Sequence, residues 1–368
     1  MDFELNAEQL MLREASRRML AERAPLDREH IDRGETVSVP GLWQLGVELG
    51  WTGLAVPEGY GGTGQGLTEL ILVAEELGRA AAPGPFVPTA LVALAVSRAH
   101  GAALRAEVLP ELAEGTAATW AFAEPGRAWA PEEIGTTARA VDGGFVLDGV
   151  KSVVQDAADA RWLLVTALAG TETATLLVDR SAPGVSIRRH QAMDPTRTFH
   201  EVRFEGVLVP AERLVDSGAD ASRRLLDDAS ILTAADALGV MERLLTLTVD
   251  HVSARVQFGR PIGSFQAVKQ ACASMAMDVQ ATRAATYYAA MAADAGAPDA
   301  ARAACAAASQ AGSAARRVAG HALQLHGGIG FTWEHDLHLY LRRAMVDAAL
   351  HGDPAQHDER LCGLLLAG

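Results

Sequence analysis

The sequence predicts a mainly helical protein with a small β domain in its middle. Helical periodicity dominates the first third of the chain, short alternating apolar runs between turn signals fill about residues 117–210, and long helical stretches follow. The 368 residues also exceed the usual size of one hydrophobic core. We therefore expect three units: an N-terminal helical domain over residues 1–116, a middle β domain over 117–212 and a C-terminal four-helix bundle over 213–368.

The N-terminal unit has helical periodicity from Phe3 to about Thr116. We expect Asn6 to cap an amphipathic helix whose apolar positions include Leu10 and Met19. Glycine and proline pairs then divide the region into shorter helices.

The middle unit consists of short apolar or alternating runs separated by Asp-Gly, Ala-Gly and Pro-Gly pairs. Such runs between turn signals favour strands, and we expect a small antiparallel, barrel-like β domain. The clearest strand candidates begin at Gly144, Trp162, Ala174 and Val202.

The C-terminal unit returns to the helical period and keeps it. Four long helices with short glycine or proline joints predict a bundle, and the abundance of alanine permits close packing, including against another subunit. The expected helices span residues 222–257, 265–295, 299–326 and 334–350.

The composition excludes several classes of function. A formal net charge of −14 argues against nucleic-acid binding, which needs a concentrated basic face. No run of about 18 uncharged apolar residues is present, and the chain opens with Asp2 and Glu4 instead of a basic segment. We therefore expect a cytoplasmic protein without a signal peptide or a membrane span.

Two patterns resemble ligand sites but are better explained otherwise. The Gly62–Gly66 segment follows no strand and lacks the spacing of the dinucleotide fingerprint, so we expect a tight turn. His321, His326, His335 and His338 match no helical two-histidine motif, and no cysteine or carboxylate cluster completes a ligand shell. We expect no metal site.

Three separated stretches resemble the acyl-CoA dehydrogenase family. Leu49–Gly64 with Ala74–Gly78 is similar to its N-terminal domain, and Arg255–Gln266 and Gln324–Phe331 are similar to its two C-terminal signatures. The resemblance extends over essentially the whole chain. It implies FAD as cofactor, α,β-desaturation of an acyl-CoA thioester, an electron-transferring flavoprotein as electron acceptor, and a tetramer.

The residue types in the two C-terminal signatures suit a dinucleotide. A guanidinium can bind pyrophosphate oxygens in a bidentate manner, an aromatic ring offers a packing face, and paired glycines allow close backbone approach. Taken alone, the same residue pattern also fits a glycine-capped helix end beside a surface arginine. The resemblance instead implies that these residues reach across a dimer interface to the FAD of the neighbouring subunit. They are Arg255, Phe258, Phe265, Gln266, Gln324, Gly327 and Gly328.

The catalytic base of the family is missing. The family removes the α-proton with a Glu nine residues after an Arg in the last long helix, and that count from Arg342 reaches His351. In a minority of members the Glu lies 26 residues before the signature Arg, which corresponds to Ala229, next to Asp228. The candidate bases are therefore His351, whose ordinary pKa lies near neutrality, and Asp228.

The expected contacts to the flavin ring are also altered. Where the family has Thr-Glu-Pro-Gly and then a Gly-Ser-Asp turn, this chain has Ala123–Gly126 followed by Arg127–Pro131. The family's Lys-x-Trp-Ile-Thr appears as Lys151–Gln155, in which valine replaces tryptophan. The nucleotide-end residues are thus present, whereas the ring contacts and the base are not.

Three hypotheses follow. The chain resembles the short, Glu-lacking subunit of heterotetrameric acyl-CoA dehydrogenases that act on steroid side chains, which would make it an accessory subunit for a bulky acyl-CoA. Alternatively, it is a self-sufficient homotetramer that uses Asp228 or His351 as its base. A third possibility is a non-enzymatic scaffold that binds a partner through its bundle.

Overall fold

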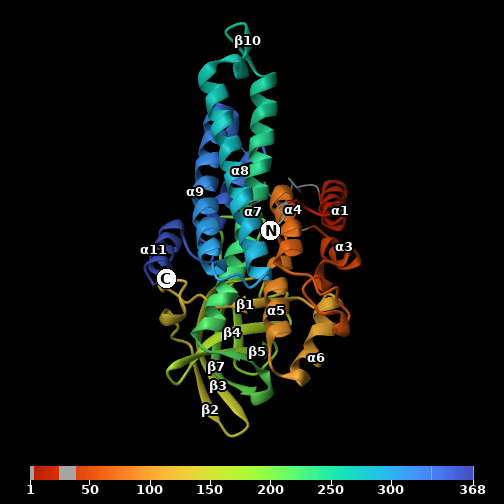
Figure 1. Cartoon of the computed structure of the whole chain (residues 1–368), viewed down its shortest axis with the longest axis vertical. Coiled ribbons are helices and arrows are strands. Elements are labelled where there is room, and N and C mark those ends of the chain that lie inside the picture. The colour runs from red at the N-terminus through yellow and green to blue at the C-terminus, as the bar shows by residue number, and fades with distance from the viewer. Residues whose placement is uncertain (1–3, 25–38, 333, 368) are drawn as a thin grey trace.

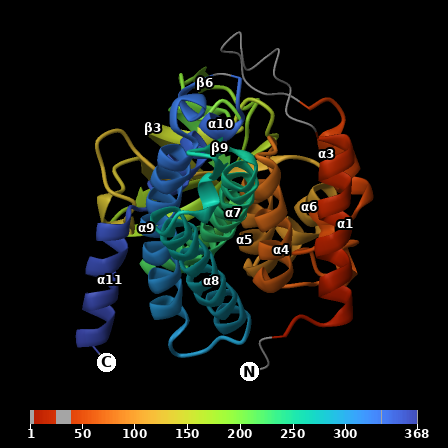
Figure 2. The same cartoon turned by 90° about the horizontal axis from the view of Figure 1, so that it is seen from above.

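The computed structural model describes residues 4–24, 39–332 and 334–367. A tall helical bundle stands on a β-sheet, and a layer of shorter helices covers one side of both (Figure 1). Seen along the bundle, α1 (Ala7–Arg23) and α11 (Pro354–Leu366) lie on opposite flanks (Figure 2). Within the described residues, none of the helices combines the length and apolar character that crossing a membrane requires. The predicted start at Phe3 lies outside the described residues.

The N-terminal helices form the predicted helical unit. Asn6 caps the first of them through its side chain, as expected. Asp294, at the end of the bundle helix α8 (Gln266–Asp294), accepts hydrogen bonds from the amides of Leu67 and Thr68. The carboxylate of Asp294 therefore caps the N-terminus of the helix that begins at Leu67, directly after the Gly62–Gly66 turn. The helices are α1 (Ala7–Arg23), α3 (Leu42–Glu48), α4 (Leu67–Ala80), α5 (Phe86–Arg98) and α6 (Ala102–Ala113).

The middle unit is one eight-stranded sheet with the order β6-β7-β3-β2-β4-β5-β8, to which β1 adds beside β4. The sheet is mixed and not antiparallel throughout, because β1 and β2 both run parallel to β4. The β2–β3 hairpin between β1 and β4 supplies the long connection that a parallel pair needs. The strands are β1 (Ala118–Ala121), β2 (Thr137–Val141), β3 (Gly144–Gln155), β4 (Trp162–Ala169), β5 (Glu172–Asp179), β6 (Val185–Arg189), β7 (Phe199–Pro210) and β8 (Leu214–Ser217).

The bundle contains the four predicted helices, with ends that differ from the prediction by three residues or fewer: α7 (Ala219–Ala254), α8 (Gln266–Asp294), α9 (Ala300–His326) and α10 (Leu337–Asp347). A short hairpin of β9 (Val256–Gln257) and β10 (Arg260–Pro261) joins α7 to α8 at the tip farthest from the sheet (Figure 1). An additional helix, α11 (Pro354–Leu366), was not predicted and packs against α9.

Two glycines bring α4 and α7 into backbone contact. A Cβ atom on Gly239 would lie 1.8 Å from the carbonyl oxygen of Glu75, and one on Gly78 would lie 2.0 Å from that of Asp236. Side chains at these positions would force the two helices apart. The glycines therefore fix the N-terminal helices against the bundle.

We predict that Gly239→Ala lowers the free energy of unfolding by about 1–3 kcal/mol, because the new methyl group cannot fit without moving α4. Denaturant unfolding followed by circular dichroism measures the change. The matched control is Gly320→Ala on α9, where a Cβ meets nothing within 4 Å. That variant should be stabilised by about 0.5–1 kcal/mol, since alanine favours a helix interior over glycine. Equal effects at the two positions would contradict the proposed contact.

Candidate functional site

His351 occupies the expected base position at the joint between the bundle and the sheet. It follows α10 in a left-handed backbone conformation (φ 63°), and its Nδ1 lies 2.8 Å from the hydroxyl of Thr233 on α7. Its side chain is buried. Burial, together with the nearby charge of Arg197, lowers the pKa of His351 to about 3. An imidazole in this environment is neutral and a weak base.

Two tryptophan rings enclose His351. The ring of Trp129 meets it edge to face with centroids 4.9 Å apart, and Trp120 from β1 stacks at 6.3 Å. The cavity beside it, lined by Thr233, Leu350 and Gly352 among others, measures about 10 Å³. That volume is at the lower limit for a single water molecule. The space next to His351 on the bundle side is therefore filled by protein atoms.

Asp228, the second candidate base, is buried on α7 and forms an ion pair with Arg98 of α5. Burial raises the pKa of Asp228 to about 6 despite this pair. Its neighbour Asp227 pairs with Arg360 of α11. Both carboxylates are thus engaged by arginines within the chain.

The segment expected to contact a flavin ring contains a buried ion pair. Lys151 donates from Nζ to Glu124 at 2.8 Å and to the carbonyl oxygen of Phe122 at 2.9 Å. Glu124 also accepts hydrogen bonds from the backbone amides of Gly135 and Thr136. Burial lowers the pKa of Lys151 to about 8 although Glu124 opposes the change. This pair fixes β3 to the segment that follows β1.

Val153 replaces the family's tryptophan and is conformationally strained. Its φ is 55°, a value that β-branched residues rarely adopt, and it lies where the β3–β7 register shifts between Lys151 and Val154. The residue is 40% exposed, so packing does not account for the residue type.

We predict that Val153→Gly raises the free energy of unfolding by about 1 kcal/mol, because glycine adopts positive φ without a steric penalty. Val153→Ala keeps a Cβ and should gain less. Thermal unfolding midpoints of the two variants and the parent chain give the ranking. A loss of stability in Val153→Gly would show that the side chain contributes packing that outweighs the backbone strain.

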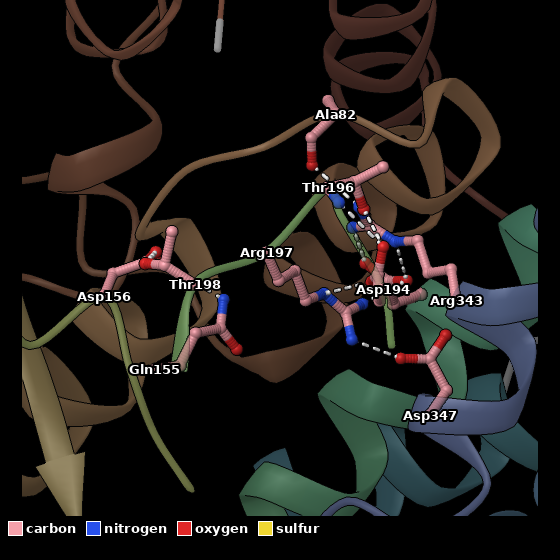
Figure 3. Close-up of polar contacts among 10 residues, drawn as sticks. Ala82, Gln155, Asp156, Asp194, Thr196, Arg197, Thr198, Arg343 and Asp347 are labelled. Atoms are coloured by element: carbon pink, nitrogen blue, oxygen red, sulfur yellow. Dashed lines mark hydrogen bonds and ion pairs between the residues drawn. The ribbon is translucent and has the colours of Figure 1, made fainter. Parts of the chain in front are cut away.

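A second buried cluster ties the three units together (Figure 3). Arg197, in the loop before β7, lies 2.6 Å from Asp236 of α7 and 2.5 Å from Asp347 of α10. Arg343 of α10 forms a bidentate pair with Asp236 and donates to the carbonyl oxygen of Ala82, which follows α4. The cluster therefore joins the N-terminal helices, the sheet and the bundle.

The charges of this cluster do not balance when all groups are ionised. Asp194, Asp236 and Asp347 face two guanidiniums, and all five side chains are buried. Burial raises the pKa of Asp347. At Asp236 burial acts in the same direction, but the two arginines outweigh it and lower the pKa to about 2. Of these two carboxyls, Asp347 is the one that burial disfavours in its charged form.

The residues predicted for the nucleotide end of FAD gather at the tip of the bundle. Phe258 of the hairpin is 92% exposed and meets Phe265 edge to face at 6.1 Å. Gln266 begins α8, and Arg255 directly follows α7. The end of α9 lies beside them because the rings of His251 and His326 stack at 4.5 Å.

The α9 end supplies the other predicted residues. Gln324, Gly327 and Gly328 are exposed, and a Cβ on either glycine would meet nothing within 4 Å. Of the four histidines considered for a metal, His326 and His335 are in ring contact at 4.8 Å. The described residues contain no group of three or more side chains arranged to hold a metal ion.

Three domain models of one family match the chain: the acyl-CoA dehydrogenase N-terminal domain over residues 6–116, its middle domain over 119–207 and its C-terminal domain over 216–359. The chain belongs to the acyl-CoA dehydrogenase family. The predicted family and fold are confirmed. The exact domain boundaries given above stay a prediction.

Several relatives are similar to this chain over nearly their whole length. Acyl-CoA dehydrogenase IpdE2 of Mycobacterium tuberculosis (strain ATCC 25618 / H37Rv) is 37% identical over 333 residues, which cover 90% of this chain and 87% of the relative. A chain of the Tcur3481-Tcur3483 steroid ACAD variant matches with a TM-score of 0.89 at 32% identity, covering 98% of both chains. A chain of the ChsE4-ChsE5 complex from Mycobacterium tuberculosis matches with a TM-score of 0.91 at 27% identity, covering 100% of both.

Acyl-CoA dehydrogenases are flavoproteins with FAD as cofactor. Two regions of this chain are expected to contact FAD, the tip of the bundle and the sheet, and they differ in how well they suit it. The tip offers an exposed guanidinium at Arg255, an exposed ring at Phe258 and open glycine backbone, all of which suit the nucleotide end. At the sheet, the ring of Trp129 and the side chain of Val153 replace the family's contacts. These segments therefore lack the tryptophan at residue 153 and the Gly-Ser-Asp turn that the resemblance implies for contacts to a flavin ring.

The tip of the bundle and the base position are also far apart. Thr233, which contacts His351, and Arg255 are separated by 22 residues on and directly after α7, or roughly 33 Å of helix. The base position and the tip therefore lie far apart along the bundle. Sequence reasoning identified the tip and His351 but missed Trp129, whose position in the altered turn was the available signal.

Proposed function

We propose that this chain is the base-lacking accessory subunit of an FAD-dependent acyl-CoA dehydrogenase heterotetramer. A partner subunit would supply the carboxylate and the flavin-ring site for α,β-desaturation of a bulky, steroid-type acyl-CoA thioester. The observation that carries the proposal is the state of the base position. A buried histidine, bonded to Thr233 and enclosed by tryptophan rings, stands at residue 351 where the family has its Glu.

In this proposal the chain contributes through its tip. Arg255 would bind pyrophosphate oxygens of the partner's FAD, Gln266 and Gln324 would donate to ribose or adenine, and Phe258 would cover an apolar face. When bound, FAD would supply the acceptor for the hydride of the β-carbon, and an electron-transferring flavoprotein would be the electron acceptor. The steroid ACAD and ChsE4-ChsE5 relatives support a two-chain assembly of this kind.

The decisive experiment is flavin quantitation with and without a partner. The chain should be co-expressed with longer, Glu-containing family members and purified as a complex. We expect one FAD for every two chains in the complex, and neither stoichiometric FAD nor acyl-CoA turnover for the chain alone. One FAD per chain and turnover without a second polypeptide would reject the accessory role.

Variants of this chain separate the accessory subunit from the self-sufficient enzyme. Within the complex, Asp228→Asn and His351→Asn should leave the rate of flavin reduction by substrate unchanged, because neither residue acts as base. Arg255→Ala should lower FAD retention, whereas Arg188→Ala, an exposed arginine of β6, should not. If either Asp228→Asn or His351→Asn abolishes flavin reduction in a folded complex, that residue is the base.

A further inference from the structure

Four aromatic rings form a continuous cluster at the joint between the sheet and the bundle. Trp129 stacks on Phe122 with centroids 5.9 Å apart and an interplanar angle of 6°, and it meets His351 edge to face. Trp120 contacts Phe122 at 4.8 Å and also stacks on His351. The rings come from β1, from the segment after it and from the α10–α11 loop, so the cluster spans two units.

The positions of these rings are fixed by polar contacts behind them. Trp120 donates from its indole nitrogen to the hydroxyl of Thr166 at 3.0 Å. The buried Lys151 binds the carbonyl oxygen of Phe122, and Thr233 holds His351. Among the four rings, that of Trp129 is the one only partly buried, and it lies in the segment that replaces the family's Gly-Ser-Asp turn. Trp129 is thus the outermost ring of the cluster, and these polar contacts hold the other three rings in place.

We propose that the indole of Trp129 occupies this chain's own flavin-ring site and closes it to a flavin. A planar aromatic side chain stacks on the same surface that a planar ring ligand would use. It also covers His351, so it blocks approach to the base position. The inference deepens the proposed function, on which it rests, by assigning the exclusion of a second flavin to one side chain.

The test uses lumiflavin, the bare ring without the nucleotide, as a probe of the isolated chain. Trp129→Gly and the milder Trp129→Ser should open the cluster, since an apolar cavity left by a removed side chain binds aromatic ligands. We expect saturable quenching of lumiflavin fluorescence, with affinity roughly tenfold or more above that of the parent chain. Trp129→Phe keeps a ring and should stay closed. Excess ADP, a probe of the nucleotide end, should not compete.

The outcomes distinguish the two proposals. If both opened variants fold, as shown by unchanged circular dichroism and complex formation with the partner, but bind lumiflavin no better than Trp129→Phe, the occupant role is wrong while the accessory role stands. If the parent chain already binds lumiflavin as tightly as the opened variants, the site is not closed, and the occupant role is again rejected. Stoichiometric FAD on the parent chain would reject the accessory role itself.

Discussion

Arg197→Met is expected to lower the free energy of unfolding by about 3–5 kcal/mol, the usual result of removing one partner from a buried ion pair. The guanidinium lies 2.6 Å from Asp236 and 2.5 Å from Asp347, in a cluster that joins all three units. Methionine fills similar space but leaves buried carboxylate charge uncompensated. Denaturant unfolding at neutral pH measures the loss.

Two further variants identify the cause of this loss. Arg188→Met removes the exposed pair with Glu201 and should cost less than about 1 kcal/mol. Adding Asp347→Asn to Arg197→Met should recover part of the stability, because a buried carboxyl that has lost its arginine must carry an unpaired charge or take up a proton, and asparagine does neither. An Arg197→Met chain with the unfolding midpoint of the parent would show that Arg343 alone balances the cluster.

The second large effect is a dependence of the free energy of unfolding on pH, and it arises from His351. Its pKa is lowered from 6.5 to about 3 in the folded chain, so the unfolded chain takes up a proton at a pH where the folded chain does not. Its neutral form therefore supports the fold fully above a pH of about 6.5. As the pH falls from there toward 3, this one group removes about 1.4 kcal/mol of stability for each pH unit.

His351→Asn isolates this contribution. Asparagine tolerates the left-handed backbone at this position and can still bond to Thr233, but it does not titrate in this range. The difference in unfolding free energy between the parent chain and the variant should be constant above a pH of about 6.5 and should shift in favour of the variant below it. A difference that does not change with pH would mean that His351 is as accessible to protons in the folded chain as in the unfolded one.

The sequence was sufficient to predict elements whose determinants are local. The bundle helices follow from periodicity between glycine and proline joints, and their predicted ends lie close to the observed ones. The helix α11 could have been predicted as well, since Asp353, Pro354 and Gln356 form a capped helix start with proline in the first turn. The parallel pairing of β1 with β4 could not, because it depends on how a distant strand enters the sheet.

The environment of the candidate site depends on contacts between residues far apart in the chain. Arg197 and Asp347 are 150 residues apart, and Thr233 and His351 are 118 residues apart. Counting from Arg342 located His351, but its low pKa arises from burial under rings of the sheet unit. Neither the count nor the residue type contains that information.

The length of α7 has an evolutionary consequence. Because this single helix carries the hairpin tip at one end and the joint with the sheet near the other, substitutions at one end do not touch the other. After a gene duplication, selection for nucleotide binding can preserve the tip of one copy while the reactive pocket of the same copy accumulates mutations. Division of labour between two descendants then requires no change in the scaffold.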